Sequence, residues 1–130
     1  MKSLFYLTAI TLLITAINAC KKNTNVDLTS TLKGTWIGKI AGGLDVPSGP
    51  CTISFQDGNK ITMTTSILND SPYKGLWRIN GNTLMVDSLV SSVKPSEKFK
   101  FTAAINGNRI EGTWANTNSQ FGGSFYVDKQ

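Results

Sequence analysis

The side chains that most often carry catalysis or bind metal ions are scarce in this sequence. Among 130 residues there is no His, and the two Cys are Cys20 and Cys51. Histidine is the usual general base and the commonest metal ligand, and two thiolates cannot complete a four-cysteine zinc site. Asp87 and Glu111 stand alone in alternating segments, on faces expected to meet solvent. The composition therefore predicts that the chain is not an enzyme and holds no metal or cofactor.

An apolar segment near the start of the chain predicts export. Leu4–Ile17 is mostly apolar and follows the positively charged Lys2. A transmembrane helix needs about 20 apolar residues, whereas a shorter apolar run after a positive charge is typical of a signal peptide. We expect residues 1–19 to be a signal peptide that is removed from the mature protein.

The residues that end this segment resemble the lipobox of bacterial lipoproteins. Ile17 lies three positions before Cys20, and the small residue Ala19 lies directly before it. The resemblance implies cleavage before Cys20, diacylglycerol on its sulfur, and acylation, for instance with palmitate, of the new amino group. Two or more acyl chains anchor a protein stably. The implied partner is therefore the membrane, and the implied location is the bacterial cell envelope, at the outer membrane. The alternative is an ordinary secretory signal cleaved after Ala19.

Lipidation of Cys20 would leave Cys51 without a partner in the chain. Cys51 has apolar neighbours at alternate positions, and a buried free Cys behaves as a small hydrophobic residue. The alternative is a Cys20–Cys51 disulfide, which an oxidising compartment permits. Residues 20–31, the lipidated cysteine and a polar stretch without a period, are expected to form a flexible tether that spans roughly 15–20 Å on average.

The positive charge of the chain indicates its surroundings. The net charge is +5, and it falls to +4 when Lys2 leaves with the signal peptide. The basic residues are spread along the chain without a block of like charges, so nucleic acid is not an expected partner. Lys21 and Lys22, next to the proposed anchor, fit a basic surface near anionic lipid.

The chain from Leu32 onward has a period of two, which is typical of half-buried strands. We find no convincing amphipathic helix in this part. The eight alternating segments begin near Leu32, Cys51, Lys60, Tyr73, Thr83, Lys98, Ile110 and Gly123. Residues 32–130 are therefore expected to form one all-β domain.

Short and long connections alternate between these segments. Each short connection contains Asp-Gly or Asn-Gly, which adopts the positive φ of tight hairpins. The short connections are 57–59, 80–82 and 106–108, and the long ones are 41–50, 67–73, 89–97 and 115–120. In an up-and-down meander, alternate connections lie at opposite ends. We expect a single eight-stranded antiparallel up-and-down barrel, which leaves no exposed strand edge.

Gly34-Thr35-Trp36, at the start of the first strand, resembles the Gly-x-Trp signature of lipocalins, and a similar start occurs in avidins. The chain is most similar to the small lipocalin-like lipoproteins of Bacteroidota, with a calycin-type barrel. It lacks the arginine that packs on the lipocalin tryptophan, for which Lys129 is a possible replacement. Biotin needs polar groups inside the barrel, and the inward positions here are nearly all apolar, so biotin binding is not expected.

The candidate site is the barrel interior and its open mouth. Eight large side chains are expected to point inward: Phe55, Met63, Tyr73, Trp77, Phe99, Phe101, Trp114 and Phe125. The first hypothesis is non-catalytic binding of a small hydrophobic ligand inside the barrel or at its mouth, near Leu44, Val46, Tyr73 and Val90. An eight-stranded barrel is near the size that admits one small ligand. Trp36, near the end with the short turns, is expected to be a structural plug.

The alternative is that these side chains simply fill the core, since a domain of about 100 residues has little core to spare. The chain would then be a protein-binding module or inhibitor that recognises an envelope protein through its long loops. The connection 41–50 is the first choice for such contacts, because it is long, partly apolar and stiffened by Pro47 and Pro50.

Overall fold

The structure is a computed structural model that describes residues 27–69 and 71–130. The predicted signal peptide, the lipidation site Cys20 and the first part of the predicted tether lie outside the described residues. Within the described ranges, no helix has the length and apolar character needed to span a membrane.

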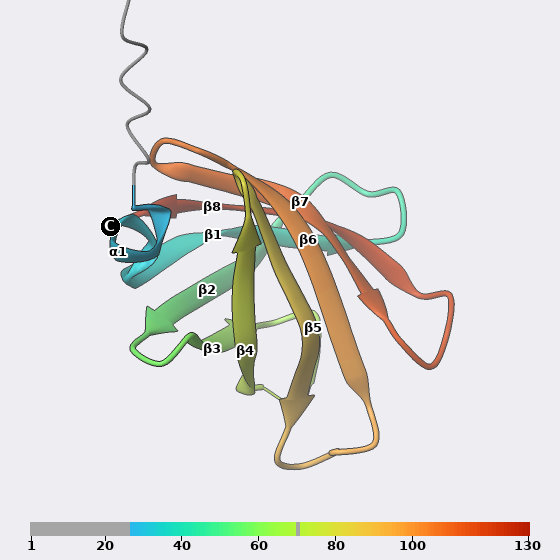
Figure 1. Ribbon diagram of the computed structural model, residues 1–130. Coiled ribbons are helices and arrows are strands. Elements are labelled where there is room, and N and C mark those ends of the chain that lie inside the picture. Colours follow the sequence, from blue (N-terminus) through green and yellow to red (C-terminus); the bar gives the residue numbers. More distant parts are fainter. Residues whose placement is uncertain (1–26, 70) are drawn as a thin grey trace, which may run out of the picture.

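Eight antiparallel strands follow one another in chain order around a closed barrel (Figure 1). They are β1 Gly34–Gly42, β2 Gly49–Gln56, β3 Lys60–Thr65, β4 Tyr73–Asn80, β5 Thr83–Ser91, β6 Lys98–Asn106, β7 Arg109–Asn116 and β8 Gly122–Lys129. The barrel closes because β1 pairs with β8 as well as with β2, from Trp36 opposite Lys129 to Gly42 opposite Gly123. The predicted eight-stranded up-and-down barrel is confirmed.

The connections sort to two ends of the barrel, as the alternation predicted. The end with the three hairpin turns, which we call the closed end, has Gly58, Gly81 and Gly107 at φ of 71°, 62° and 60°. This left-handed conformation favours glycine and suits a tight hairpin. The opposite end, the loop end, carries the connections 43–48, 66–72, 92–97 and 117–121. Three of them are shorter than expected, because strand pairing continues further toward the loops, whereas 66–72 has the expected length.

A short helix, α1 (Leu28–Leu32), precedes the barrel. The expectation that residues 28–31 belong to a flexible tether was therefore wrong. The helix is capped by Asp27, whose carboxylate accepts a hydrogen bond from the Thr29 N–H at 3.1 Å. Leu28 and Leu32, four residues apart on one helix face, both pack against the barrel core. This burial orders the segment despite its polar composition.

Helix α1 and the C-terminal end of β8 together cover the closed end of the barrel. Trp36 is fully buried, and its indole Nε1 donates a hydrogen bond of 2.8 Å to the Leu32 carbonyl. The Lys129 ammonium group lies 5.7 Å from the centre of the Trp36 ring and donates to the Thr31 carbonyl. Trp36 is thus a plug at the closed end, as expected, and Lys129 packs on it where the lipocalin resemblance implies an arginine.

Strand β5 contains a β-bulge that the strand pattern did not predict. Between the residues paired with Gly75 and Trp77 of β4, strand β5 has two residues, Asp87 and Ser88, where β4 has one. Both bulged residues are exposed. The backbone passes so close to β4 here that a Cβ atom on Gly75 would lie 2.3 Å from the Ser88 carbonyl oxygen. Gly75 is therefore required by the close approach of the bulge.

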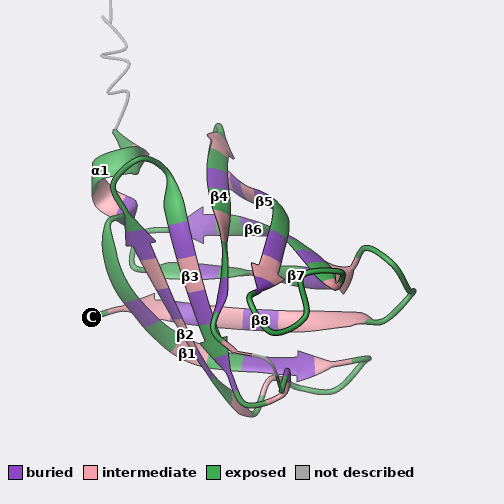
Figure 2. Cartoon of the chain, turned by 90° about the horizontal axis from the view of Figure 1, so that it is seen from below, coloured by how far each residue is buried: buried purple, intermediate pink, exposed green. Residues whose placement is uncertain are grey.

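The inward-facing residues form one contiguous core with contributions from α1 and from every strand. Buried and exposed residues alternate along the strands in Figure 2, as the period of two requires. Cys51 is part of this core, and burial raises the pKa of its thiol to about 12. Residues 27–69 and 71–130 hold a closed barrel with its own core, so we expect the chain from Asp27 onward to fold on its own.

Candidate functional site at the loop end

All eight side chains proposed to line a ligand site point into the barrel. Each is between 1% and 3% exposed, and all belong to the contiguous core. These residues are Phe55, Met63, Tyr73, Trp77, Phe99, Phe101, Trp114 and Phe125. The structure therefore brings the predicted set together inside the barrel.

The aromatic rings contact one another edge to face along the barrel interior. Phe55 lies 5.8 Å from Trp77, and Phe101 lies 5.2 Å from Phe125, measured between ring centroids. These distances and the T-shaped geometry are those of favourable, close-packed aromatic pairs. The Trp114 indole N–H is satisfied by the Ala41 carbonyl at 2.9 Å. The interior is thus packed as a protein core.

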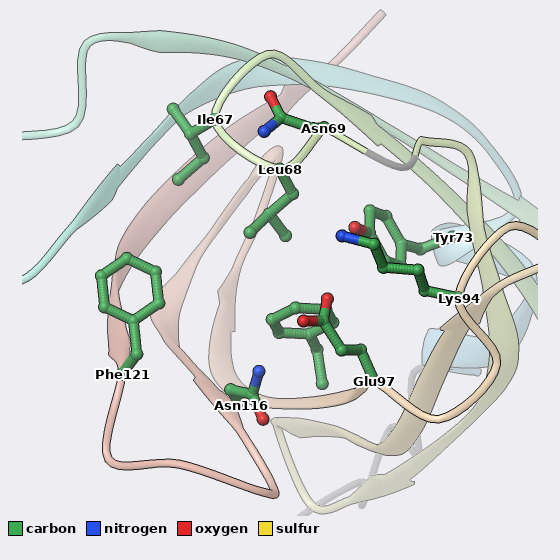
Figure 3. A pocket seen from close by; sticks show the side chains of 9 residues that line it. Ile67, Leu68, Asn69, Tyr73, Lys94, Glu97, Asn116 and Phe121 are labelled. Carbon is green, nitrogen blue, oxygen red and sulfur yellow. The ribbon is translucent and has the colours of Figure 1, made fainter.

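A hollow of about 210 Å³ opens at the loop end (Figure 3). Its lining comes from the ends of three strands and from three of the four long connections. The lining residues are Ile67, Leu68, Asn69, Tyr73, Lys94, Glu97, Phe99, Asn116 and Phe121. Of the eight predicted site residues, only Tyr73 and Phe99 line this hollow.

The hollow combines apolar walls with polar and charged side chains at its opening. Tyr73 and Phe99 contribute aromatic surface at centroids 5.2 Å apart, and Leu68 packs into the core beside them. Lys94 and Glu97, from the β5–β6 connection, bring opposite charges to its edge (Figure 3). Typical ligand pockets hold roughly 300–1,000 Å³. This hollow is smaller, and suits one large side chain better than a whole apolar ligand.

Four large hydrophobic side chains surround the loop end without cover, and we call them the apolar rim. They are Leu44, Val46, Val93 and Phe121, all more than half exposed. Phe121 links the rim to the core, because its ring lies 5.3 Å from that of Trp114 and also lines the hollow. The predicted neighbours of the mouth are only partly right. Leu44, Val46 and Tyr73 lie at the loop end, but Val90 lies on the outer face of the barrel, paired with Lys74.

Sequence reasoning missed most of the hollow, because its residues lie in connections that have no period. Lys94, Glu97 and Asn116 give no signal of their own among other polar loop residues. Phe121 does give a signal in the sequence, because it is a lone aromatic residue between a polar stretch and Gly122-Gly123. An isolated aromatic residue in a loop of otherwise polar residues is a candidate contact residue.

Three ion pairs lie on the outside of the barrel: Lys33–Asp57, Arg78–Asp87 and Arg109–Asp128. Arg109 donates two hydrogen bonds to the Asp128 carboxylate, at 2.8 and 2.9 Å, and thereby lowers the pKa of Asp128. Arg78 holds Asp87 in the same way, and lowers its pKa. Across residues 27–69 and 71–130, no group of three or more Cys, Asp or Glu side chains is placed to hold a metal ion.

Comparison with known proteins adds no functional assignment. No protein-family model matches the chain, and no curated protein matches it at a significant level. The lipocalin-like resemblance therefore stays a prediction.

Proposed function

We propose that the chain is a lipid-anchored protein of a bacterial cell envelope that binds a protein partner through the loop end of a filled barrel. One observation carries this proposal. The large inward side chains are packed against one another, whereas the apolar rim is exposed around a hollow at the loop end. Exposed hydrophobic residues gathered at one end of a small protein are typical of an interaction surface.

The position of the first described residues supports this arrangement. Asp27 and helix α1 lie at the closed end, opposite the loop end (Figure 1). Cys20 and Asp27 are seven residue steps apart, which span at most about 25 Å when fully extended. A lipid on Cys20 would therefore hold the closed end near the membrane and leave the apolar rim accessible to a partner.

The hollow gives the surface a place for an anchoring side chain. Binding energy at protein interfaces is concentrated in a few residues, often aromatic, that enter well-packed pockets. The hollow behind Phe121 has about the volume for one such residue. Its walls are apolar, and polar side chains lie at its opening. The exposed Leu44 and Val46 would then extend the contact across the β1–β2 connection.

The docking claim is tested with a photo-crosslinking amino acid placed at position 44, at position 121, or at Ile37. Ile37 is also an exposed apolar residue, but it lies on the outer side of β1. We expect a discrete crosslinked product in cells from positions 44 and 121, lost in a Val46→Asp background, and none from position 37. Equal products from all three positions would contradict a specific surface at the loop end.

The anchoring claim is tested by Cys20→Ser. We expect the native chain to incorporate labelled palmitate and to stay with membranes that are washed in about 1 M salt, which screens electrostatic contacts. The Cys20→Ser chain should do neither. Association of an unlabelled Cys20→Ser chain with membranes that persists through the high-salt wash would show that Cys20 is not the anchor.

A small apolar ligand at the mouth is the second candidate, favoured by the aromatic walls that Tyr73, Phe99 and Phe121 give the hollow. The variants Leu44→Asp and Phe121→Asp distinguish ligand binding from protein binding. Binding of a small apolar molecule is measured with a fluorescent naphthylamine probe. Ligand binding in the hollow requires Phe121 and tolerates Leu44→Asp, because Leu44 does not line the hollow. Protein binding requires both residues.

A further inference from the structure

The uncompensated positive charge of the barrel is gathered on one side. Strands β3 to β6 carry Lys60, Lys74, Lys98 and Lys100 on their outer faces, all exposed, and none forms an ion pair with another described residue. Arg78 and Asp87, also on this side, neutralise each other through two hydrogen bonds. Lys100 lies close enough to Asp87 to feel its charge.

The pairing of the strands makes these residues neighbours. Val90 of β5 lies between Lys74 of β4 and Lys98 of β6 in one row. Lys60 of β3 pairs with Leu76 of β4 in the next row. We call the set Lys60, Lys74, Leu76, Val90, Lys98 and Lys100 the lysine face. It consists of lysines around an apolar centre, in which Leu76 is 64% exposed.

The rest of the described barrel has no such excess. The outer side of β3 to β6 holds five of the ten basic residues that the structure describes and one of the seven acidic residues. The remaining described residues are five basic and six acidic, which is close to neutral. The excess positive charge of the barrel is therefore concentrated on one side. A side with this charge can orient the molecule toward a surface of opposite charge.

The same side is hollowed. Two depressions of about 370 and 360 Å³ lie next to each other and share Lys74 and Gly75. Asp87 and Ser88 of the β5 bulge line the second of these depressions. Leu76 and Val90 line the second depression, so apolar surface lies within reach of the lysine ammonium groups.

We propose that the lysine face docks on the anionic lipid surface of the membrane to which the chain is anchored. This inference rests on the proposed anchor, which would keep the barrel within about 25 Å of lipid. Lys21 and Lys22, next to Cys20 in the sequence, carry the same sign of charge. Each lysine near an anionic membrane surface contributes to binding without a fixed geometry, and Leu76 provides an apolar side chain that can enter the headgroup region.

The composition of the lysine face favours lipid over an acidic protein. Protein interfaces are depleted in lysine and enriched in aromatic residues and arginine. The lysine face has no aromatic residue, and Arg78 beside it is already paired with Asp87. Lysine is a flexible, hydrated point charge that suits a fluid array of phosphates.

This orientation leaves the proposed docking surface free. Leu44 and Val46 lie in the β1–β2 connection and Phe121 in the β7–β8 connection. These connections lie on the other side of the barrel from β4 and β5 (Figure 1). A barrel resting on its lysine face therefore still exposes most of the apolar rim.

The experiment measures binding of the chain from Asp27 onward to lipid vesicles, because this chain holds the whole barrel without the acylation site or Lys21 and Lys22. We expect sedimentation with vesicles that contain about 30% phosphatidylglycerol in phosphatidylcholine, and not with phosphatidylcholine alone. We also expect the binding to weaken strongly between about 0.1 M and about 1 M salt, as charges become screened.

Matched variants assign the binding to the lysine face. Lys74→Gln and Lys98→Gln should each lower the partition coefficient about fivefold, whereas Lys39→Gln, on the outer side of β1, should not change it. Leu76→Asn should weaken binding, and Ile37→Asn, an exposed apolar control on β1, should not. All these positions are exposed, so the variants are expected to fold.

Two results would overturn the proposal. One is vesicle binding that falls equally with Lys39→Gln and Lys74→Gln, because the net charge alone would then explain it. The other is tight binding to soluble polyglutamate without vesicle binding, which would assign the face to an acidic protein. Both readouts use an unacylated chain and leave the loop end intact. Their failure is therefore distinct from failure of the proposed anchor or of the proposed loop-end contacts.

Discussion

Replacing Phe101 by alanine distinguishes a filled barrel from a ligand-binding one. The Phe101 ring is 2% exposed, lies 5.2 Å from the Phe125 ring and does not line the hollow at the loop end. In a packed core, Phe→Ala removes the apolar contacts of the ring and leaves a cavity, which costs about 3–5 kcal/mol of unfolding free energy. The whole domain is expected to have about 5–15 kcal/mol.

Urea unfolding of the chain from Asp27 onward measures this loss. With a slope of about 1–3 kcal/mol per molar urea, a loss of 3–5 kcal/mol should move the midpoint by roughly 2 M at the centre of both ranges. Phe121→Ala is the matched control, because Phe121 is about half exposed and should cost far less. Phe101→Leu provides a milder change if the alanine variant does not fold.

A small effect would refute the reasoning. If Phe101→Ala folds and loses less than about 1 kcal/mol with an unchanged slope, the ring does not fill a packed interior. The barrel would then contain a space beside Phe101, and the first hypothesis of an internal apolar ligand would regain its support.

Three further predictions follow from individual contacts. Gly38→Ala should destabilise the barrel by about 1–3 kcal/mol or more, because the new Cβ would lie 1.9 Å from the Tyr126 carbonyl oxygen, between β1 and β8. The outward-facing Thr35→Ala is the control and should not destabilise the barrel. Urea unfolding measures both changes. The Cys51 thiol, with its pKa raised to about 12, should resist a thiol reagent at pH 8 in the folded chain and react in urea, and rapid labelling of the folded chain would contradict its burial. Because Arg109 lowers the pKa of Asp128 below its usual value of 3.8, the pair should stabilise the fold above about pH 4 and lose this effect as the pH falls through the lowered pKa. Arg109→Gln should reduce the dependence of the unfolding midpoint on acid pH, and an unchanged dependence would show that the pair contributes nothing.

The barrel could be predicted because its determinants are local. Alternation of inward and outward residues sets the strands, and Gly58, Gly81 and Gly107 set the hairpins between them. Once eight strands alternate with short and long connections, closure of the sheet is the arrangement that leaves no edge. The burial of the eight large inward residues follows from the same alternation.

The helix and the bulge could not be predicted from the same pattern. Helix α1 is one turn long, too short to show a period, and depends on the packing of Leu28 and Leu32 against the barrel. The Asp27 cap was a usable signal that the polar composition concealed. The bulge at Asp87 and Ser88 depends on the close approach of two strands at Gly75, which is a property of the closed barrel.

The candidate site was the least predictable part. Whether inward aromatic rings surround a space or fill it depends on the barrel diameter and on ring orientation, neither of which appears in a sequence. The hollow behind Phe121 depends on how three connections fold over the mouth. The lysine face depends on strand register, which brings Lys60, Lys74 and Lys98 together although they are separated in the sequence.

The central claim is that the barrel is filled and binds at its loop end. Native mass spectrometry of the Cys20→Ser chain, purified from bacterial cells without organic solvent, tests it most directly. We predict a mass equal to that of the polypeptide, unchanged after extraction with organic solvent. A discrete additional mass that extraction removes, and that Phe101→Ala or Phe121→Asp alters, would show that the barrel holds an apolar ligand and would contradict the account.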